Sequence, residues 1–275
     1  MLFFNSSANR VTSFRIRQRL SQPRAKGFRV ASSRFEKTSS QIIMQSNNSN
    51  SIWAIVVAGG QGLRFGTGEP KQFLPLAGRP LFEYSLNCLN QIPEIEGTIL
   101  VLPQAYHAAY QAPRHDRLAV VAGGKLRQDS VLQGLAAIPV SARWILIHDA
   151  ARPLVDVFIV QETLKAAQST GAAVAAVPIA DTLKKADNEG FVKNTVDRQG
   201  LYQSQTPQVF RRDLLEQGFA YAKANRLEVT DEAALMESIG VKVRLASGSP
   251  RNFKITTPLD FELAEQLVLG QRKKA

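Results

Sequence analysis

Five short apolar runs, separated by longer amphipathic segments, constrain the fold of this chain more than any other feature. The runs cover residues 52–58, 97–103, 118–123, 143–149 and 172–179. They are apolar almost throughout instead of alternating with polar residues, as strands are when helices cover both faces of a sheet. Helical periodicity fills residues 80–91, 129–138 and 155–170. This order predicts an α/β fold, with a Rossmann-like, mostly parallel sheet that binds ligands at the carboxyl ends of its strands.

Residues 180–200 interrupt that alternation. Two polar, strand-like arms flank the sequence DNEG at residues 187–190, which is typical of a β-hairpin turn. Little in this segment is apolar enough for a core, so we expect a hairpin arm that projects from the body. Such an arm either reaches a ligand or a second subunit, or is only a surface decoration.

The last third returns to α/β character. Helices are predicted at residues 211–226 and 230–240, and strands at 241–247 and 252–257. A final helix is expected to have Thr257 as its N-cap, Pro258 at its first position, Asp260 in its first turn and Gly270 at its end.

Composition limits the class of protein. With 275 residues, 44% of them hydrophobic, the chain can bury one sizeable core. No apolar run approaches the roughly 18–20 residues of a membrane-spanning helix. The single cysteine, Cys88, excludes a disulfide within the chain and favours a reducing compartment, with Cys88 as a buried, inert thiol.

The formal net charge of +11 suggests a nucleic-acid-binding protein, but its distribution argues against that class. Nine basic residues and one acidic residue lie within residues 1–43, which leaves only about +3 for the remainder. The charge therefore belongs to the N-terminal segment and not to the predicted globular part.

We interpret residues 1–50 as a disordered N-terminal extension, and residues 51–270 as one catalytic domain with its arm at about 180–200. The extension is rich in Ser, Arg and Asn and has no apolar stretch like that of a secretory signal. It is either a transit-like segment, which would indicate the plastid stroma, or the product of a misassigned start, with Met44 as the true first residue. The second reading favours a bacterial cytoplasm.

A glycine-rich loop, AGGQGLRFGTGEPKQ at residues 58–72, follows the first predicted strand. Glycines let backbone N–H groups approach an anion closely. The spacing G-x-G-x-x-x-G is one residue too long for the dinucleotide fingerprint, and no Gly-Lys-Ser/Thr completes a P-loop. The loop therefore favours a triphosphate wrapped by glycines and contacted by Arg64 and Lys71, with a plain glycine-rich turn as the alternative.

Two more segments follow predicted strands. In IHDAARP, at 147–153, Asp149 is a candidate Mg²⁺ ligand beside a triphosphate, and Arg152 lies three residues further on. We interpret His148 as a packed histidine, because the chain has no zinc-ligand spacing. In GGKLRQDSV, at 123–131, Ser130 opens a helix and contacts either that helix or a base or ribose.

Several motifs occur together in one order. They are AGGQGLRFG…PKQFLPLAGRPL, GGKLRQDSVLQGL, HDAARPLV, DTLKK, TVDRQGLYQSQTPQVF, VTDEA and NFKITTPLDFELAE. Over about residues 52–269 the chain thereby resembles the 2-C-methyl-D-erythritol 4-phosphate cytidylyltransferase family of the non-mevalonate isoprenoid pathway. The resemblance implies a fold like that of the nucleotide-diphospho-sugar transferases. It also implies transfer of CMP from CTP to methylerythritol 4-phosphate, with release of pyrophosphate and with Mg²⁺ as cofactor.

The resemblance also assigns roles to residues of this chain. Arg64 and Lys71 would stabilise the transition state, Lys254 would reach a reacting phosphate, and Asp149 would hold Mg²⁺. The nucleotide would be bound by Ala58, Gly59, Gly60, Gly124, Ser130, Asp149 and Ala150.

The methylerythritol phosphate side is implied to be completed across a homodimer, because the family's hairpin crosses to a second subunit. Arg198, on that hairpin, would be both a catalytic and a substrate-binding residue. The substrate-side set is Arg152, Thr182, Arg198, Thr206 and Thr230, and Thr230 has a helix N-cap as its alternative role.

The nearest alternative function is cytidylyl transfer to ribitol 5-phosphate on the same fold. A sugar-1-phosphate nucleotidyltransferase fits the motifs HDAARP and TPQ poorly. A basic-tailed nucleic-acid-binding protein and a non-catalytic regulator on the same scaffold are the remaining alternatives. We expect neither nucleic acid nor a membrane as a partner.

Overall fold

The computed structural model describes residues 50–59, 70–107, 110 and 117–272. All described elements belong to one compact unit, Gln45–Ala275. The predicted extension, with the alternative start at Met44, lies outside the described residues apart from residue 50, so these predictions remain predictions.

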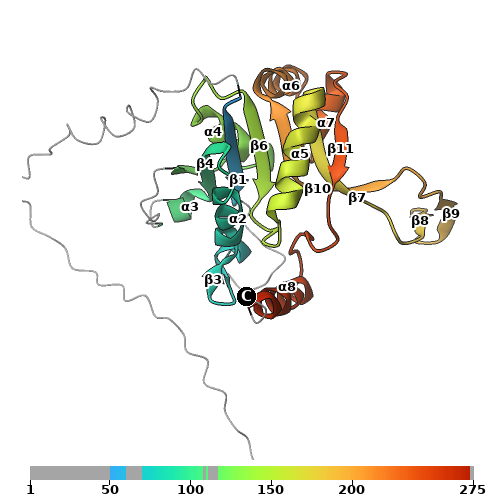
Figure 1. Cartoon of the computed structure of the whole chain (residues 1–275). Coiled ribbons are helices and arrows are strands. Elements are labelled where there is room, and N and C mark those ends of the chain that lie inside the picture. The colour runs from blue at the N-terminus through green and yellow to red at the C-terminus, as the bar shows by residue number, and fades with distance from the viewer. Residues whose placement is uncertain (1–49, 60–69, 108–109, 111–116, 273–275) are drawn as a thin grey trace, which may run out of the picture. The chain divides into compact units, whose positions relative to one another are not determined.

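A seven-stranded sheet in the order β11-β7-β10-β6-β1-β4-β5 forms the centre of the unit (Figure 1). Only β10 runs antiparallel to its neighbours, β6 and β7, and every other pair is parallel. The predicted Rossmann-like, mostly parallel sheet is thereby confirmed. Its strands are β1 (Ile52–Val57), β4 (Ile95–Leu102), β5 (Leu118–Ala122), β6 (Trp144–Asp149), β7 (Ala172–Pro178), β10 (Tyr202–Arg211) and β11 (Arg244–Ser247).

Helices cover both faces of this sheet. On one face the core contains side chains of α2 (Leu81–Asn90) and α5 (Val157–Thr170). On the other it contains side chains of α4 (Arg127–Ala136), α6 (Arg212–Asn225) and α7 (Glu232–Ser238). Strand β1 contributes side chains to both cores, because successive side chains of a strand point to opposite faces of the sheet. Its residues are apolar throughout for that reason.

Smaller elements complete the unit. Helix α8 (Pro258–Arg272) packs beside the short strand β2 (Pro75–Leu76) in a third apolar cluster. Strand β2 pairs with β3 (Arg79–Pro80), and the one-turn helices are η2 (Lys71–Phe73) and α3 (Gln104–His107). Within the described ranges, no helix has the length and apolarity that crossing a membrane requires.

The polar arm is a hairpin of β8 (Leu183–Ala186) and β9 (Val192–Val196), and it projects from the body in Figure 1. It continues the pairing of β7 with β10, since the Ile179 N–H donates to the Leu201 carbonyl. Most of its residues are exposed. The predicted hairpin is confirmed, whereas its predicted role in dimerisation is untested.

Two sequence predictions need correction, and one strand was missed. Residues 252–257 form a loop and not a strand, because Asp260 accepts the N–H groups of Thr256 and Thr257 in place of a strand partner. Helix α8 continues past Gly270, which does not take up the left-handed conformation that ends a helix. Strand β10 was not predicted at all.

Candidate active site

A cleft of about 740 Å³ opens at the carboxyl ends of β1, β4, β5 and β6, where ligands bind in folds of this type. Glycines form part of its wall, after β1 at Gly59 and after β5 at Gly123 and Gly124. The charged side chains on its lining are four cations, Lys71, Lys125, Arg127 and Lys254, and one carboxylate, Asp149. The described part of the cleft therefore has an excess of positive charge, which suits a polyphosphate ligand.

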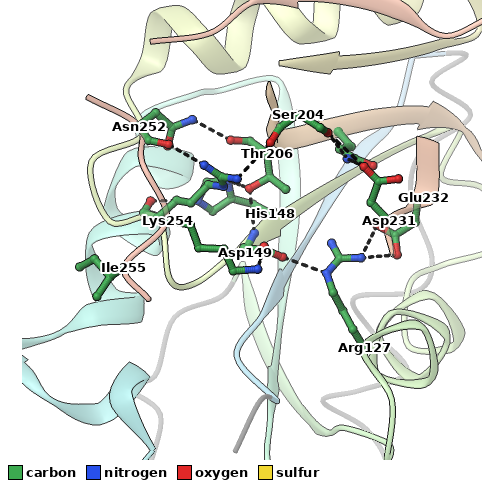
Figure 2. A network of polar contacts seen from close by, with 12 residues as sticks. Arg127, His148, Asp149, Ser204, Thr206, Asp231, Glu232, Asn252, Lys254 and Ile255 are labelled. Atoms are coloured by element: carbon green, nitrogen blue, oxygen red, sulfur yellow. Dashed lines mark hydrogen bonds and ion pairs between the residues drawn. The ribbon is translucent and has the colours of Figure 1, made fainter. Parts of the chain in front are cut away.

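Asp149 is the last residue of β6 and is only 7% exposed. Its two carboxylate oxygens are both paired: Oδ1 accepts from Arg127 Nε at 3.0 Å, and Oδ2 accepts from Lys254 Nζ at 2.7 Å (Figure 2). Burial alone would raise the pKa of Asp149, but Arg127 and Lys254 hold it well below its usual range. The carboxylate is therefore ionised at neutral pH.

Arg127, the first residue of α4, also contacts Glu232, the first residue of α7. Its Nη1 donates to both Glu232 oxygens, at 2.7 and 2.8 Å. Burial alone would lower the pKa of Arg127, but Asp149 and Glu232 outweigh it and raise the pKa. Arg127 and Glu232 were not among the predicted site residues, although they lie in the motifs GGKLRQDSV and VTDEA.

The buried residues His148 and Thr206 form a hydrogen-bond chain to the backbone of Asp149. The Asp149 N–H donates to Thr206 Oγ1, which lies 3.0 Å from His148 Nδ1. His148 Nε2 lies 3.2 Å from the Arg152 carbonyl, which can only accept, so Nε2 carries the proton and Nδ1 accepts from Thr206. Burial lowers the pKa of His148 to about 4, so the ring is neutral at neutral pH, as predicted for a packed histidine. Thr206 is 4% exposed and braces the backbone here.

Ser130 joins the glycine segments. Its hydroxyl accepts the Gly124 N–H at 3.2 Å and donates to the Leu126 carbonyl at 3.2 Å. A Cβ added at Gly59 would come within 2.9 Å of Ser130 Oγ, and one added at Gly123 within 2.8 Å. Ser130 is therefore packed between the two glycine segments and also borders the cleft.

The other described nucleotide-side residues line the same cleft, but some of their backbone groups are already hydrogen-bonded. The Ala58 N–H donates to the Val101 carbonyl, and the Ala150 N–H donates to the Val57 carbonyl. Lys71 Nζ donates to the Ile255 carbonyl and so bridges two segments of the lining.

Unlike the described nucleotide-side residues, the predicted substrate-side residues do not line the cleft. Arg152 does not line the cleft; Nη1 donates to the Asn252 carbonyl and Nη2 to the Ser204 carbonyl. Thr182 and Arg198 are exposed on the arm. Thr230 is exposed and is not a helix N-cap, because Asp231 caps α7 by accepting the Ala234 N–H.

Two predicted residues, Arg64 and Gly60, lie outside the described residues, as does most of the glycine-rich loop. In the part of the chain that the structure describes, no group of three or more His, Cys, Asp or Glu side chains is placed to hold a metal ion. Asp149 thus stands as a single carboxylate candidate and not as part of a protein metal cage.

Comparisons with known proteins agree with this geometry. The family model described as 2-C-methyl-D-erythritol 4-phosphate cytidylyltransferase matches residues 52–270. A bifunctional IspD/IspF enzyme of Desulfotalea psychrophila is 42% identical over 80% of this chain, which covers 57% of that longer protein. A chloroplastic 2-C-methyl-D-erythritol 4-phosphate cytidylyltransferase of Oryza sativa is 39% identical, over 79% of this chain and 74% of the relative.

Among solved structures, the 2-C-methyl-D-erythritol 4-phosphate cytidylyltransferase of Thermus thermophilus superimposes with a TM-score of 0.68. It is 34% identical, and the match covers 79% of this chain and 98% of that one. The family match spans the whole described sheet and the cleft at its carboxyl edge. The chain therefore belongs to the 2-C-methyl-D-erythritol 4-phosphate cytidylyltransferase family.

Proposed function

We propose that this chain transfers CMP from CTP to 2-C-methyl-D-erythritol 4-phosphate. The products are 4-diphosphocytidyl-2-C-methyl-D-erythritol and pyrophosphate, and the step belongs to isoprenoid precursor synthesis. The observation that carries the proposal is the cleft, in which glycine backbone and four cations surround one carboxylate. Family membership supplies the identity of the two substrates.

The reaction joins two anions that repel each other, and the cations of the cleft reduce that repulsion. An oxygen of the methylerythritol phosphate attacks the α-phosphorus of CTP, and the bond from this phosphorus to the β-phosphate oxygen breaks. Pyrophosphate leaves with the electron pair of that bond. Lys71 and Lys254 reduce the repulsion between the reactants and stabilise the charge that develops, with Arg64 proposed to do the same. Such a displacement needs no covalent protein nucleophile.

Asp149 is the residue proposed to hold Mg²⁺. When bound, the ion neutralises phosphate charge and orients the triphosphate. Mg²⁺ commonly takes one or two carboxylates and fills its remaining positions with phosphate oxygens and water, so a single aspartate at the cleft is a suitable donor. Oδ2 becomes available when Lys254, whose side chain is 40% exposed, turns away from it. The residues present thus fit the ion.

A homodimer is proposed on the basis of the arm. Thr182 and Arg198 are exposed on it, together with the apolar side chains of Phe191 (68% exposed) and Val192 (63%). A second copy of this chain would cover these apolar side chains and receive Arg198 beside its own cleft. Light scattering coupled to gel filtration measures the molar mass, and a monomer at micromolar concentration contradicts this part of the proposal.

The bacterial cytoplasm is the proposed location, with the plastid stroma as the alternative. A relative from rice with comparable sequence identity is described as chloroplastic, which is why the plastid stroma is kept as the alternative location. N-terminal sequencing of the protein isolated from its native cells separates them. A protein that begins at Met1 or Met44 supports the cytoplasm, and one that begins at any other residue of the first 50 supports the plastid.

Pyrophosphate release tests the function directly. The full chain is supplied with CTP, Mg²⁺ and either methylerythritol 4-phosphate or ribitol 5-phosphate, and a Lys71→Ala preparation reports any contaminating activity. Release with methylerythritol 4-phosphate alone is expected. Release with ribitol 5-phosphate alone overturns the substrate assignment, and release with neither overturns the enzymatic function.

A further inference from the structure

The ion pair between Arg127 and Glu232 connects two segments that lie 105 residues apart in the sequence. Arg127 follows the glycines of the nucleotide side, and Glu232 lies two residues after Thr230, a candidate for the substrate side. Figure 2 shows the guanidinium between Asp149 and Glu232. None of the roles assigned above explains this pair.

The pair is costly to build. The Glu232 side chain is completely buried, and a buried carboxylate is unfavourable unless it is paired and hydrogen-bonded. Burial raises the pKa of Glu232, and Arg127 offsets only part of that rise. An apolar residue of similar size would pack α7 at lower cost, so packing alone does not account for a glutamate here.

The geometry gives the pair a specific effect. With Nη1 held by both Glu232 oxygens, the planar guanidinium is fixed, and its Nε–H points to Asp149 Oδ1 at 3.0 Å. Arg127 Nη2 is buried and has no hydrogen-bond partner among the described residues. Glu232 and Asp149 are thus the only acceptors of this guanidinium in the described part of the chain. Glu232 sets the direction from which Arg127 meets Asp149.

The two cations on Asp149 differ in how firmly they are held. Lys254 has a side chain 40% exposed, whereas Arg127 is 25% exposed and anchored to Glu232. If Lys254 left, Asp149 would still be held through Oδ1, and only Oδ2 would lose its partner. Without Glu232, Arg127 would lose that fixed orientation, because its guanidinium group would be free to rotate.

We propose that Glu232 and Arg127 are positioning residues of the cleft: Glu232 fixes Arg127, and Arg127 orients Asp149 for the metal–nucleotide complex. This proposal rests on the proposed function for the identity of the nucleotide. Neither residue needs to touch the reacting atoms. Partners that orient a metal-binding carboxylate typically change metal affinity or activity by about 10–100-fold when they are replaced.

The first test is the affinity for Mn²⁺ in the presence of CTP, measured by electron paramagnetic resonance of the free ion. Glu232→Gln keeps the shape of the side chain but removes its charge. Arg127→Lys keeps the positive charge but removes the planar guanidinium group. We expect each variant to weaken Mn²⁺ binding by about 10–100-fold. The double variant is expected to bind no more weakly than Arg127→Lys, because Glu232 acts through Arg127.

Met236→Ala is the matched control, because Met236 is fully buried in the same helix and packs in the apolar cluster of α4, α6 and α7. It should lower the stability of α7 and leave Mn²⁺ affinity unchanged. Unchanged affinity in a folded Glu232→Gln or Arg127→Lys protein overturns the proposal, as does an equal loss in Met236→Ala. Binding is measured without turnover, so a wild type that binds Mn²⁺ and CTP but forms no product would refute the proposed function and not this inference.

Discussion

Replacing Gly59 by alanine tests how tightly the two glycine segments are packed on Ser130. The new Cβ would lie 2.9 Å from Ser130 Oγ, a distance at which one of the two atoms must move. It would lie 3.6 Å from Ser130 Cβ, which is an ordinary van der Waals contact. The clash is therefore with a single oxygen atom, and that atom can be removed by mutation.

The expected cost follows from what holds that oxygen. Moving Ser130 Oγ weakens its bonds to the Gly124 N–H and the Leu126 carbonyl, each worth about 0.5–1.5 kcal/mol. Gly59→Ala should thus lower the free energy of unfolding by about 2 kcal/mol, within the range of 1–3 kcal/mol for overpacking. Ser130→Ala alone removes both bonds and should also cost about 2 kcal/mol. The double variant should cost no more than Ser130→Ala, which is a coupling of about 2 kcal/mol.

Gly123 offers the matched control. A Cβ there would lie 2.8 Å from Ser130 Oγ, but also 3.2 Å from Val101 Cγ1 and 3.4 Å from the Leu102 carbonyl oxygen. Ser130→Ala relieves only the first of these contacts. Gly123→Ala should therefore remain destabilising in the Ser130→Ala background, where Gly59→Ala is tolerated.

Urea unfolding followed by tryptophan fluorescence measures these free energies, because Trp53 and Trp144 are both buried. The reasoning is refuted if Gly59→Ala and Ser130→Ala add within about 0.5 kcal/mol, the usual scatter for independent sites. Equal rescue of the Gly59 and Gly123 substitutions by Ser130→Ala would refute the geometry as well.

Four further predictions concern other parts of the molecule. Lys71→Ala should lower kcat by about 10²–10³-fold, the usual effect of removing one transition-state contact, with little change in the urea midpoint; a near-normal kcat contradicts its role. Arg198→Ala should be inactive alone but regain activity in hybrid dimers with Lys71→Ala, and no regain after mixing the unfolded chains and refolding them counts against a shared site. Burial raises the pKa of Cys88 to about 12, so iodoacetamide at pH 8 should modify the unfolded but not the folded protein. The same shift should make stability fall as pH rises from about 9 towards 12, because only the unfolded thiol then releases its proton.

The sheet and its helices were predictable because their signal is local. Each buried parallel strand is an apolar run, and the strands and most helices lie within a few residues of their predicted bounds. Strand β10 lacks that signal, since its buried residues include Gln205, Thr206 and Gln208. Hydrogen bonds satisfy these side chains, for instance from Gln205 to the Ser249 carbonyl and from Gln208 to Asp231. A strand whose interior is polar cannot be distinguished from a loop by periodicity.

The candidate site was predictable only in part, for the same reason. Gly59, Gly124, Asp149 and Lys254 lie in recognisable motifs, and the fold brings them to one cleft. The partnership of Arg127 with Glu232 depends on where α4 and α7 begin relative to the sheet, and no sequence spacing encodes it. Arg152 shows the converse, because its motif suggests a ligand contact while its guanidinium is engaged by backbone carbonyls.

The unequal anchoring of the two cations indicates how the cleft adapts to a triphosphate. The Lys254 side chain is 40% exposed, and Asp149 keeps Arg127 as a partner when Lys254 leaves. Removing one partner of the buried pair of Arg127 with Glu232, in contrast, costs about 3–5 kcal/mol. Phosphate oxygens offer Lys254 an equivalent anionic partner, so that residue can change partners at little cost. Arg127 cannot change partners in the same way, because Glu232 would then be left buried and unpaired. Ligand binding should therefore redirect Lys254 while Arg127 and Asp149 keep the positions they already have.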